Sequence, residues 1–338
     1  MEAVYTRIKS NMKLVTFAYN GDVRAPRIGA IVNDRVIDLQ DAAAAHAGSQ
    51  GGNLAGSMIG LLESGEEGLA RARGIVEWAT GSSGILDRST PLADTVLLAP
   101  VPRPTSMRDG YAFRQHVEAA RRNRGVEMIP EFDQFPVFYF TNHNAVTGPG
   151  DVEVMDLHLQ KLDFELECAI VIGREGRNIK ASEADEYIGG YTIMNDWSAR
   201  VLQMEEMKMS LGPAKGKDFA TSIGPYLATR DELASKRIAG EKGERYDLTM
   251  VARVNGTEVS RGNLKDMSWS FGEIIERASY GVTLYPGDVI GSGTVGTGCF
   301  LELNGSKITD NWWLKDGDVV ECEIEMLGTL VNRIVHVG

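Results

Sequence analysis

Three carboxylates alternate with other residues between Asp163 and Glu167. In an extended strand alternate side chains share a face, so Asp163, Glu165 and Glu167 should point the same way. A solvated strand face is the common explanation of such alternation. Here the pattern runs directly into the apolar segment 169–172, typical of a buried strand, where neighbouring like charges need a compensating cation. Carboxylate oxygens suit a hard divalent metal ion.

Three further residues in separate segments could contribute to such a site. Asp196 lies where a strand is predicted to end and a helix to begin, so a helix N-cap is an equally good explanation. Lys217 lies in a glycine-containing loop that could place an ammonium group beside the carboxylates, although lysines are mostly solvent-exposed. His116 lies beside the apolar stripe of a predicted helix, where structural and catalytic roles are both open.

Other catalytic patterns are absent from the sequence. The remaining histidines form no H-E-x-x-H pattern, so zinc-protease chemistry is not supported. The chain contains neither a G-x-S-x-G elbow nor a Walker loop. Three widely separated cysteines without CxxC spacing indicate neither a disulfide framework nor a structural zinc site, and they fit a reducing cytoplasm.

Charge and hydropathy restrict the partners of the chain. Over 338 residues the formal net charge is −12, which argues against binding to nucleic acid and to anionic membrane surfaces. No apolar run reaches the roughly 18 residues of a membrane span, and the N-terminus lacks an apolar signal core. Met12 is a second possible start, so we expect residues 1–11 to be a leader or upstream extension.

The pattern of strands, helices and turns suggests two domains. Short strands and then glycine-interrupted helices are predicted over residues 12–99, and the proline-rich segment after residue 96 suggests a boundary near residue 100. In the part 100–338 a helix is predicted from Tyr111 to Arg124. The strands predicted beyond it cover 162–172, 191–194, 249–254, 288–290 and 319–326.

From residue 100 onward these segments resemble the fumarylacetoacetate hydrolase family. Glu165 and Glu167 are similar to its metal-binding pair, Asp196 in Asn-Asp-Trp-Ser-Ala-Arg to its third carboxylate, and Lys217 in Lys-Gly-Lys-Asp-Phe to its catalytic-loop lysine. Segments 284–294 and 317–325 resemble the late strands of the family. The resemblance implies an α+β, β-rich fold, with a mixed β-sandwich roll as catalytic domain, a smaller N-terminal α+β domain, and a homodimer.

Within the family, the stretch from Asp109 to His116 looks most like fumarylacetoacetase. This similarity implies that Asp109 is a metal ligand, that Tyr111 contacts substrate and that His116 is the general base. The glutamate that orients the histidine would be Glu302. Smaller acylpyruvate hydrolases use a glutamate three residues after the histidine, a position occupied here by Ala119, so Glu302 is favoured and the nearby Glu118 is the alternative.

The same comparison implies roles for several further residues. The implied substrate contacts are Tyr139, Gln203 and Thr294, while Thr221 would be a second neighbour of the cation site and Lys217 would serve both catalysis and that site. The family's carboxylate-binding arginine aligns with Gly125, so Arg124 is the nearest candidate, with Arg121 and Arg122 one turn earlier. Their position at a helix end is explained equally well by the helix dipole.

The resemblance predicts a metal-dependent hydrolase that cleaves a C–C bond in a small diketo or oxo acid, in the catabolism of aromatic compounds. Asp109, Glu165, Glu167 and Asp196 would hold Mg²⁺, with Ca²⁺ or Mn²⁺ as alternatives. An oxo-acid decarboxylase, isomerase or hydratase is the first alternative. The second, from another class, is a non-catalytic metal-binding or interaction protein.

Overall fold

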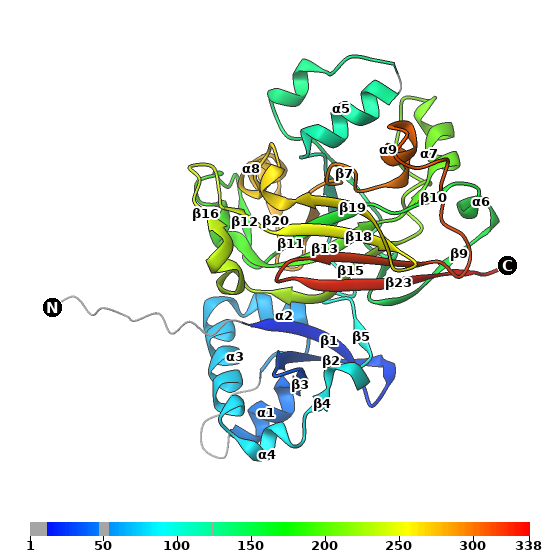
Figure 1. Cartoon of the computed structure of the whole chain (residues 1–338). Coiled ribbons are helices and arrows are strands. Elements are labelled where there is room, and N and C mark those ends of the chain that lie inside the picture. The colour runs from blue at the N-terminus through cyan, green and yellow to red at the C-terminus, as the bar shows by residue number, and fades with distance from the viewer. Residues whose placement is uncertain (1–11, 47–53, 124) are drawn as a thin grey trace.

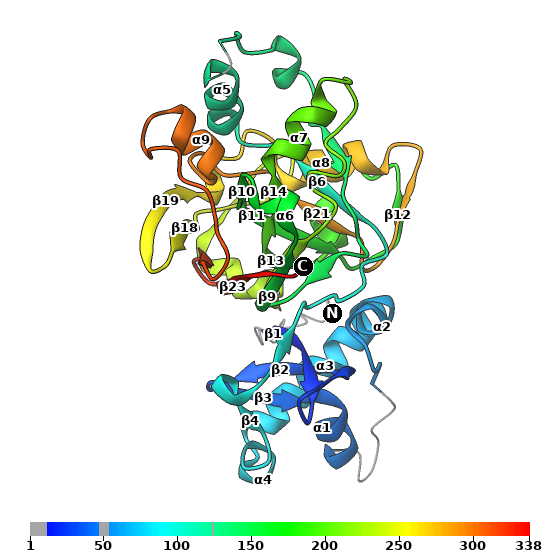
Figure 2. The ribbon, with the colours of Figure 1, turned by 90° about the vertical axis from the view of Figure 1, so that its right-hand side faces the viewer.

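The computed structural model describes residues 12–46, 54–123 and 125–338. The expected leader, residues 1–11, lies outside this described part. Figure 1 shows the N-terminal strands and helices, coloured blue to cyan, at one end of the molecule, and the strands of the remaining chain at the other. Helices α5, α7 and α9 lie at the end opposite the N-terminal part, as the second view also shows (Figure 2).

The N-terminal part is an antiparallel meander covered by helices. Its strands are β1 (Lys13–Tyr19), β2 (Asp22–Val32) and β3 (Arg35–Asp38). The helices that follow are α1 (Leu39–His46), α2 (Met58–Glu63), α3 (Gly65–Thr80) and α4 (Ser83–Leu86). The β2–β3 turn uses Asn33 and Asp34 with positive φ, a conformation that Asn and Asp tolerate better than most residues.

One large sheet joins this part to the rest of the chain. Its strand order is β4-β3-β2-β1-β15-β13-β11-β21-β6-β7, with β5 beside β1 and β8 beside β15. The expected domain boundary near residue 100 falls between β5 (Leu97–Leu98) and β6 (Met107–Gly110). The sheet nevertheless crosses it, because β1 pairs with β15 (Thr221–Ala228).

A second sheet packs on the large one. It has five strands in the order β19-β18-β22-β23-β9, and β23 contacts β15 while β22 contacts β13. Alternate residues of β11 (Leu166–Ile172) serve the two faces of the large sheet: Cys168 and Ile170 join the larger apolar core, and Ala169 and Val171 join the core under the N-terminal helices. Burial on both faces explains why this strand reads as a continuous apolar run.

The other strands have these bounds: β4 (Thr90–Pro91), β7 (Phe138–Phe140), β8 (Val146–Thr147), β9 (Gly150–Val154), β10 (Leu162–Asp163), β12 (Gly176–Arg177), β13 (Ile188–Asp196), β14 (Ser198–Ala199), β16 (Arg237–Ile238), β17 (Arg245–Tyr246), β18 (Thr249–Val254), β19 (Thr257–Asn263), β20 (Thr283–Leu284), β21 (Val289–Gly291), β22 (Val319–Ile324) and β23 (Gly328–His336). The other α-helices are α5 (Arg114–Asn123), α6 (Asp156–Leu159), α7 (Arg200–Met207), α8 (Phe271–Ser279) and α9 (Phe300–Gly305). Short 3-10 helices occupy Leu92–Asp94, Pro130–Asp133, Ala184–Tyr187, Arg230–Lys236 and Leu264–Asp266.

Two predicted elements differ from the structure in ways that affect the site. The strand predicted over 162–172 is interrupted between Asp163 and Leu166, where the N–H of Glu165 donates to the Asn195 side chain instead of a ladder partner. The helix predicted from Tyr111 begins only at Arg114. Both irregular segments contribute side chains to the same cavity.

Candidate active site

Four carboxylates meet at the centre of the large sheet. Asp109 comes from β6, Glu167 from β11, Asp196 from the end of β13, and Glu165 from the interruption before β11. All four side chains are buried, and each offers an oxygen within 4.8 Å of the others'. Adjacent strands bring them together, because β11 pairs with β13 on one side and β21 on the other, and β21 pairs with β6.

Asp163 does not join this cluster, although strand alternation predicts that it shares a face with the glutamates. Its carboxylate accepts hydrogen bonds from Arg200 Nε at 2.8 Å and from the backbone N–H groups of Phe300 and Leu301 at 2.7 and 2.9 Å. Because the strand is interrupted after β10, the Asp163 side chain can point away from Glu165 and Glu167. Asp163 therefore connects Arg200 to the first turn of α9.

Lys217 and Arg200 supply the positive charge of the site. Lys217 Nζ lies 2.5 Å from Glu165 Oε2 and 2.6 Å from Asp196 Oδ2, and Arg200 Nη2 donates to Glu165 Oε1 at 2.7 Å. Burial alone would raise the pKa of Glu165, but Lys217 and Arg200 hold it well below its usual range. The general expectation that lysines are exposed fails here, because Lys217 is buried between carboxylates.

The Asp109–Glu167 end of the cluster lacks this compensation. Burial raises the pKa of Asp109 to about 7, with the charges of Asp196 and Glu165 adding to the increase. Burial and the facing Asp109 likewise raise the pKa of Glu167 well above its usual range. The donors to this end are the N–H of Gly293, 3.2 Å from Asp109 Oδ1 and 3.0 Å from Glu167 Oε2, and the Thr294 hydroxyl. A cation here would relieve the repulsion.

Two observations show that the cluster fits a metal ion. Oδ1 of Asp196 is buried and has no hydrogen-bond partner within the described part of the chain. A Cβ atom on Gly291 would lie 2.6 Å from Asp109 Oδ1 and 2.9 Å from Glu167 Oε2, so glycine lets β21 pass close to both carboxylates. The donor set contains only oxygen atoms, which hard divalent cations prefer. Asp196 is not a helix N-cap, since Ala199 occupies that position of α7.

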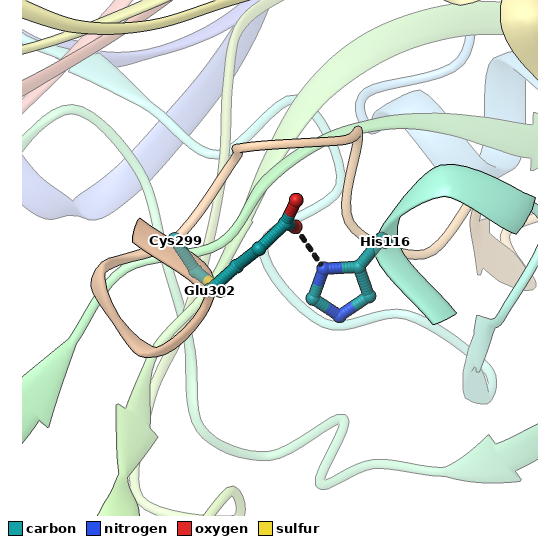
Figure 3. A group of neighbouring side chains, drawn as sticks. All are labelled: His116, Cys299 and Glu302. Carbon is teal, nitrogen blue, oxygen red and sulfur yellow. Dashed lines mark hydrogen bonds and ion pairs between the residues drawn. The ribbon is translucent and has the colours of Figure 1, made fainter. Parts of the chain in front are cut away.

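His116 and Glu302 form a buried pair across α5 and α9. Nδ1 of His116 lies 2.7 Å from Oε2 of Glu302, as the dashed line in Figure 3 shows. The alternative partner, Glu118, instead accepts a hydrogen bond from Arg114 at 2.6 Å. Cys299 lies beside the pair, but burial raises the pKa of its thiol well above the usual range, so it stays a neutral neighbour.

One cavity of about 660 Å³ is lined by His116 of this pair and by Asp109 and Glu165 of the carboxylate cluster, whereas Glu302, Glu167 and Asp196 lie behind its lining. Most of the residues that the sequence selected line it, namely Asp109, Tyr111, His116, Tyr139, Glu165, Gln203, Lys217 and Thr294. Three of the implied substrate contacts also hold the site together. The Tyr139 hydroxyl donates to Asp196, the Thr294 hydroxyl donates to Glu167, and the Gln203 side chain accepts a hydrogen bond from Arg200. Tyr111 packs edge-on against the His116 ring.

The other residues expected at the site do not belong to the described cavity lining. Thr221 is buried opposite Asp196 in the β13–β15 pairing, outside the cavity lining. Arg121 donates to the backbone carbonyl of Glu127, and neither Arg121 nor Arg122 belongs to the described lining. Arg124 lies outside the described residues. Their proximity to His116 in the sequence is the basis on which these arginines were selected.

Sequence reasoning gave no role to Arg200, although the motif Asn-Asp-Trp-Ser-Ala-Arg contains it. This buried guanidinium bridges Asp163 and Glu165. A signal was available: a cluster of several buried acids needs more than one cation, and an arginine near a carboxylate motif is well suited to bridging.

A β-rich fold with clustered carboxylates beside a histidine–glutamate pair defines a class of enzymes with a potential metal site. Residues 105–335 match the family model described as "Fumarylacetoacetate (FAA) hydrolase C-terminal". The chain therefore belongs to the fumarylacetoacetate hydrolase family.

Two relatives agree with this assignment, and a solved structure shows the same fold. The chain is 33% identical over 281 residues to the human mitochondrial oxaloacetate tautomerase FAHD2A, covering 82% of this chain and 80% of the relative. It is 32% identical over 317 residues to the oxaloacetate tautomerase YisK of Bacillus subtilis, covering 91% and 95%. A structure of maleylpyruvate hydrolase from Sphingobium sp. SYK-6, in complex with manganese(II) and pyruvate, superimposes with a TM-score of 0.67 at 23% identity, covering 97% and 100%.

These comparisons confirm the predicted family and its fold. They do not support the particular similarity to fumarylacetoacetase, because both curated relatives carry the name of a different activity. Within the described residues, no helix is long and apolar enough to cross a membrane.

Proposed function

We propose that this chain is a divalent-metal-dependent hydrolase that cleaves a C–C bond in a small 2-oxo acid with a second carbonyl group, such as an acylpyruvate. The observation that carries the proposal is that His116, which is paired with Glu302, lines the same cavity as Asp109 and Glu165 of the four-carboxylate cluster. Proton transfer and charge stabilisation can therefore act on one bound molecule.

Asp109, Glu165, Glu167 and Asp196 would hold the metal ion. Their oxygen-only set suits Mg²⁺, and Mn²⁺ or Ca²⁺ would also fit. The manganese in the maleylpyruvate hydrolase structure supports a divalent cation in this fold. When bound, the cation would supply the positive charge that stabilises an enolate. We place Thr221 as a second neighbour of this site, on the strand beside Asp196.

His116 would act as the general base. With Nδ1 donating to Glu302, the lone pair on Nε2 is free to accept a proton from water. The water oxygen then bonds to the carbonyl carbon farther from the acid group, and the bond from that carbon to its inner neighbour breaks. The electron pair leaves as an enolate, which takes the proton back at carbon. A carboxylic acid and a 2-oxo acid are the balanced products.

Lys217 and Glu302 would stabilise the charges that develop during this reaction, without forming or breaking bonds to the substrate. The Lys217 ammonium, which lies against Glu165 and Asp196, would add positive charge where the oxyanion develops. Glu302 would stabilise the imidazolium that forms when His116 takes the proton. Tyr111, Tyr139, Gln203 and Thr294 would contact substrate from the cavity wall, and Arg124 remains our choice for its carboxylate.

Keto–enol tautomerisation of oxaloacetate is the second candidate. The names of the human and Bacillus subtilis relatives favour it. It needs the same enolate stabilisation and the same base but no attacking water. A decarboxylase would need the enolate stabilisation while CO2 leaves, and a hydratase would need a water molecule to add, whereas a non-catalytic metal-binding protein would need none of these.

One assay separates these candidates. Protein loaded with Mg²⁺ or Mn²⁺ is mixed with acetylpyruvate or with oxaloacetate, and the products are followed by NMR. Acetate and pyruvate from acetylpyruvate support hydrolysis. Faster interconversion of oxaloacetate keto and enol forms, without cleavage of acetylpyruvate, would overturn it in favour of the tautomerase. Turnover of neither compound would contradict both the hydrolysis of acetylpyruvate and the tautomerisation of oxaloacetate.

We further propose a homodimer acting in the cytoplasm, in the catabolism of aromatic compounds, with residues 12–99 and 100–338 as its two domains. A single species near the 36.9 kDa of one chain in sedimentation would contradict the dimer.

A further inference from the structure

The outer part of the cavity differs in character from the metal end. It is lined by apolar side chains from two helices, one strand and nearby loops, here called the apolar rim: Val137, Phe138, Met204, Met207, Leu301 and Trp313. Three of them remain exposed although they are apolar, with exposed fractions of 46% for Val137, 37% for Met204 and 40% for Met207. Apolar groups that converge on a cavity and stay in contact with water favour an apolar ligand.

Most polar side-chain atoms of the two asparagines in this outer part bind to the protein itself. Both polar atoms of the Asn304 side chain are used, since Nδ2 donates to the Trp312 carbonyl at 2.8 Å and Oδ1 accepts from the Trp312 N–H at 2.8 Å. The Asn123 side chain donates to the Glu302 carbonyl at 3.4 Å. These groups stabilise α9 and its flanking loop, so the surface they leave for a ligand is mostly apolar.

The outer part also offers no free cation within the described lining. Lys217 and Arg200 both lie at the metal end, and both are held by carboxylates. Outside this lining, Lys161 and Arg108 lie over the Trp313 and Phe138 rings, 5.6 and 5.8 Å from the ring centroids. A second carboxylate at the far end of a substrate would therefore meet no unpaired cation among the described lining residues, and burying a carboxylate without a partner costs several kcal/mol.

From these observations we infer that the apolar rim is a subsite for an apolar acyl or alkyl group at the far end of a 2-oxo acid substrate. The inference rests on the proposed function, which it deepens by naming the substrate class. A cavity of about 660 Å³ is much larger than a small acid such as oxaloacetate requires, and pockets of roughly 300–1,000 Å³ typically enclose drug-sized ligands. The substrate is thus an oxo acid with a long apolar chain or ring and no distal carboxylate.

Binding of unreactive acids tests the subsite separately from catalysis. The probes are 2-oxobutanoate, 2-oxohexanoate and 2-oxooctanoate, which share the oxo-acid head but have no second carbonyl to cleave, and 2-oxoglutarate, which has a distal carboxylate. Kd is measured by calorimetry with protein loaded with Mn²⁺. Each added methylene should lower Kd by up to about fourfold if fully buried, and 2-oxoglutarate should bind less tightly than 2-oxohexanoate.

Variants of the rim locate the effect. Met204→Gln and Met207→Gln should each remove part of the gain with chain length while leaving the Kd of 2-oxobutanoate unchanged. Met209→Gln is the matched control, because Met209 follows the same helix, is 79% exposed and lies outside the cavity lining. It should leave the whole series unchanged.

The outcomes distinguish this inference from the proposed function. The apolar subsite is overturned if Kd is independent of chain length or if 2-oxoglutarate binds more tightly than 2-oxohexanoate. This holds even if acylpyruvates are cleaved. A Kd that falls with chain length and responds to the two rim variants supports the subsite. If acylpyruvates with matching chains are then not cleaved, the proposed hydrolysis fails and the subsite stands.

Discussion

Oε2 of Glu302 lies 2.7 Å from Nδ1 of His116, although 186 positions separate the two residues along the chain. The carboxylate comes from the first turn of α9 and the imidazole from α5, so the pair depends on how these helices contact each other. Both side chains are buried, which excludes bulk water from the hydrogen bond. A carboxylate in this position fixes the imidazole tautomer and leaves Nε2 for chemistry.

This pair should behave as one catalytic unit. His116→Ala should lower kcat by about 10²–10⁴-fold, the usual contribution of a general base, with Mn²⁺ affinity nearly unchanged. Glu302→Gln should lower kcat in the same direction but less. The double variant should be little worse than His116→Ala alone, because both changes affect one step. Steady-state kinetics of the three variants checks this, and multiplicative losses would show that the residues act independently.

Removal of the metal ion should abolish activity. Exhaustive chelation should stop turnover, and adding back Mg²⁺ or Mn²⁺ should restore it. Glu167→Gln should weaken Mn²⁺ binding by at least about tenfold, because it removes a charge from the oxygen cluster. Glu175→Gln, an exposed glutamate shortly after the same strand, is the matched control and should bind Mn²⁺ normally. Full activity in chelated protein would exclude the metal mechanism.

Metal affinity should increase with pH through neutrality. Burial raises the pKa of Asp109 to about 7, so at pH 6 this carboxyl is mostly protonated and at pH 8 mostly ionised. Only the ionised form is a ligand, and each bound ion must displace that proton. The Mn²⁺ affinity should therefore rise by about tenfold between pH 6 and pH 8, as measured by calorimetry. A constant affinity over this interval would show that Asp109 is already ionised at pH 6.

The sequence was sufficient for the parts of the site that depend on local pattern. Strand alternation identified Glu165 and Glu167, and the apolar run after them indicated burial on both faces. The resemblance to the family supplied His116 and Glu302, which no spacing rule connects. Alternation failed at Asp163 because a break in the strand turns this carboxylate toward Arg200 and α9. Such a break depends on tertiary hydrogen bonds, which sequence periodicity does not encode.

In the N-terminal part, too, local elements could be predicted from the sequence and long-range pairing could not. The strands and helices before residue 100 follow from turn residues and apolar periodicity, but no local pattern indicated that β1 would join β15 in one sheet. Pairing between distant strands is decided by the fit of both faces, since Leu14 and Leu227 both enter the core under the helices. The sequence pattern also could not predict where the Arg121 and Arg122 side chains lie, because their positions depend on how α5 ends.

Asp163 should matter for catalysis without binding metal or substrate. Asp163→Asn would leave Arg200 with one carboxylate fewer and would weaken the contact to the first turn of α9, which carries Glu302. Breaking a buried ion pair typically costs about 3–5 kcal/mol of stability. We expect a lower unfolding midpoint, a reduced kcat with little change in KM, and loss of the downfield Nδ1 proton resonance of His116 in NMR. Asp156→Asn, at an exposed position, should change none of these. An intact resonance with lowered stability would show that Asp163 is structural only.

Gly291 should be essential because its hydrogen leaves room for two carboxylates. A Cβ at this position would lie 2.4 Å from Met194 Cε, 2.6 Å from Asp109 Oδ1 and 2.9 Å from Glu167 Oε2, so Gly291→Ala must displace at least one ligand. Mn²⁺ affinity should fall at least about tenfold, as for other disturbances of metal-site geometry.

Gly74→Ala is the control for this substitution. Gly74 lies within α3, a Cβ there would meet nothing within 4 Å, and the change should raise the free energy of unfolding by about 0.5–1 kcal/mol through helix propensity. Its Mn²⁺ affinity should equal that of the parent protein. Calorimetry with Mn²⁺ and denaturant unfolding of both variants make the comparison. Normal Mn²⁺ binding by Gly291→Ala would mean that Asp109 and Glu167 do not hold the ion together, and the four-carboxylate assignment would then have to be abandoned.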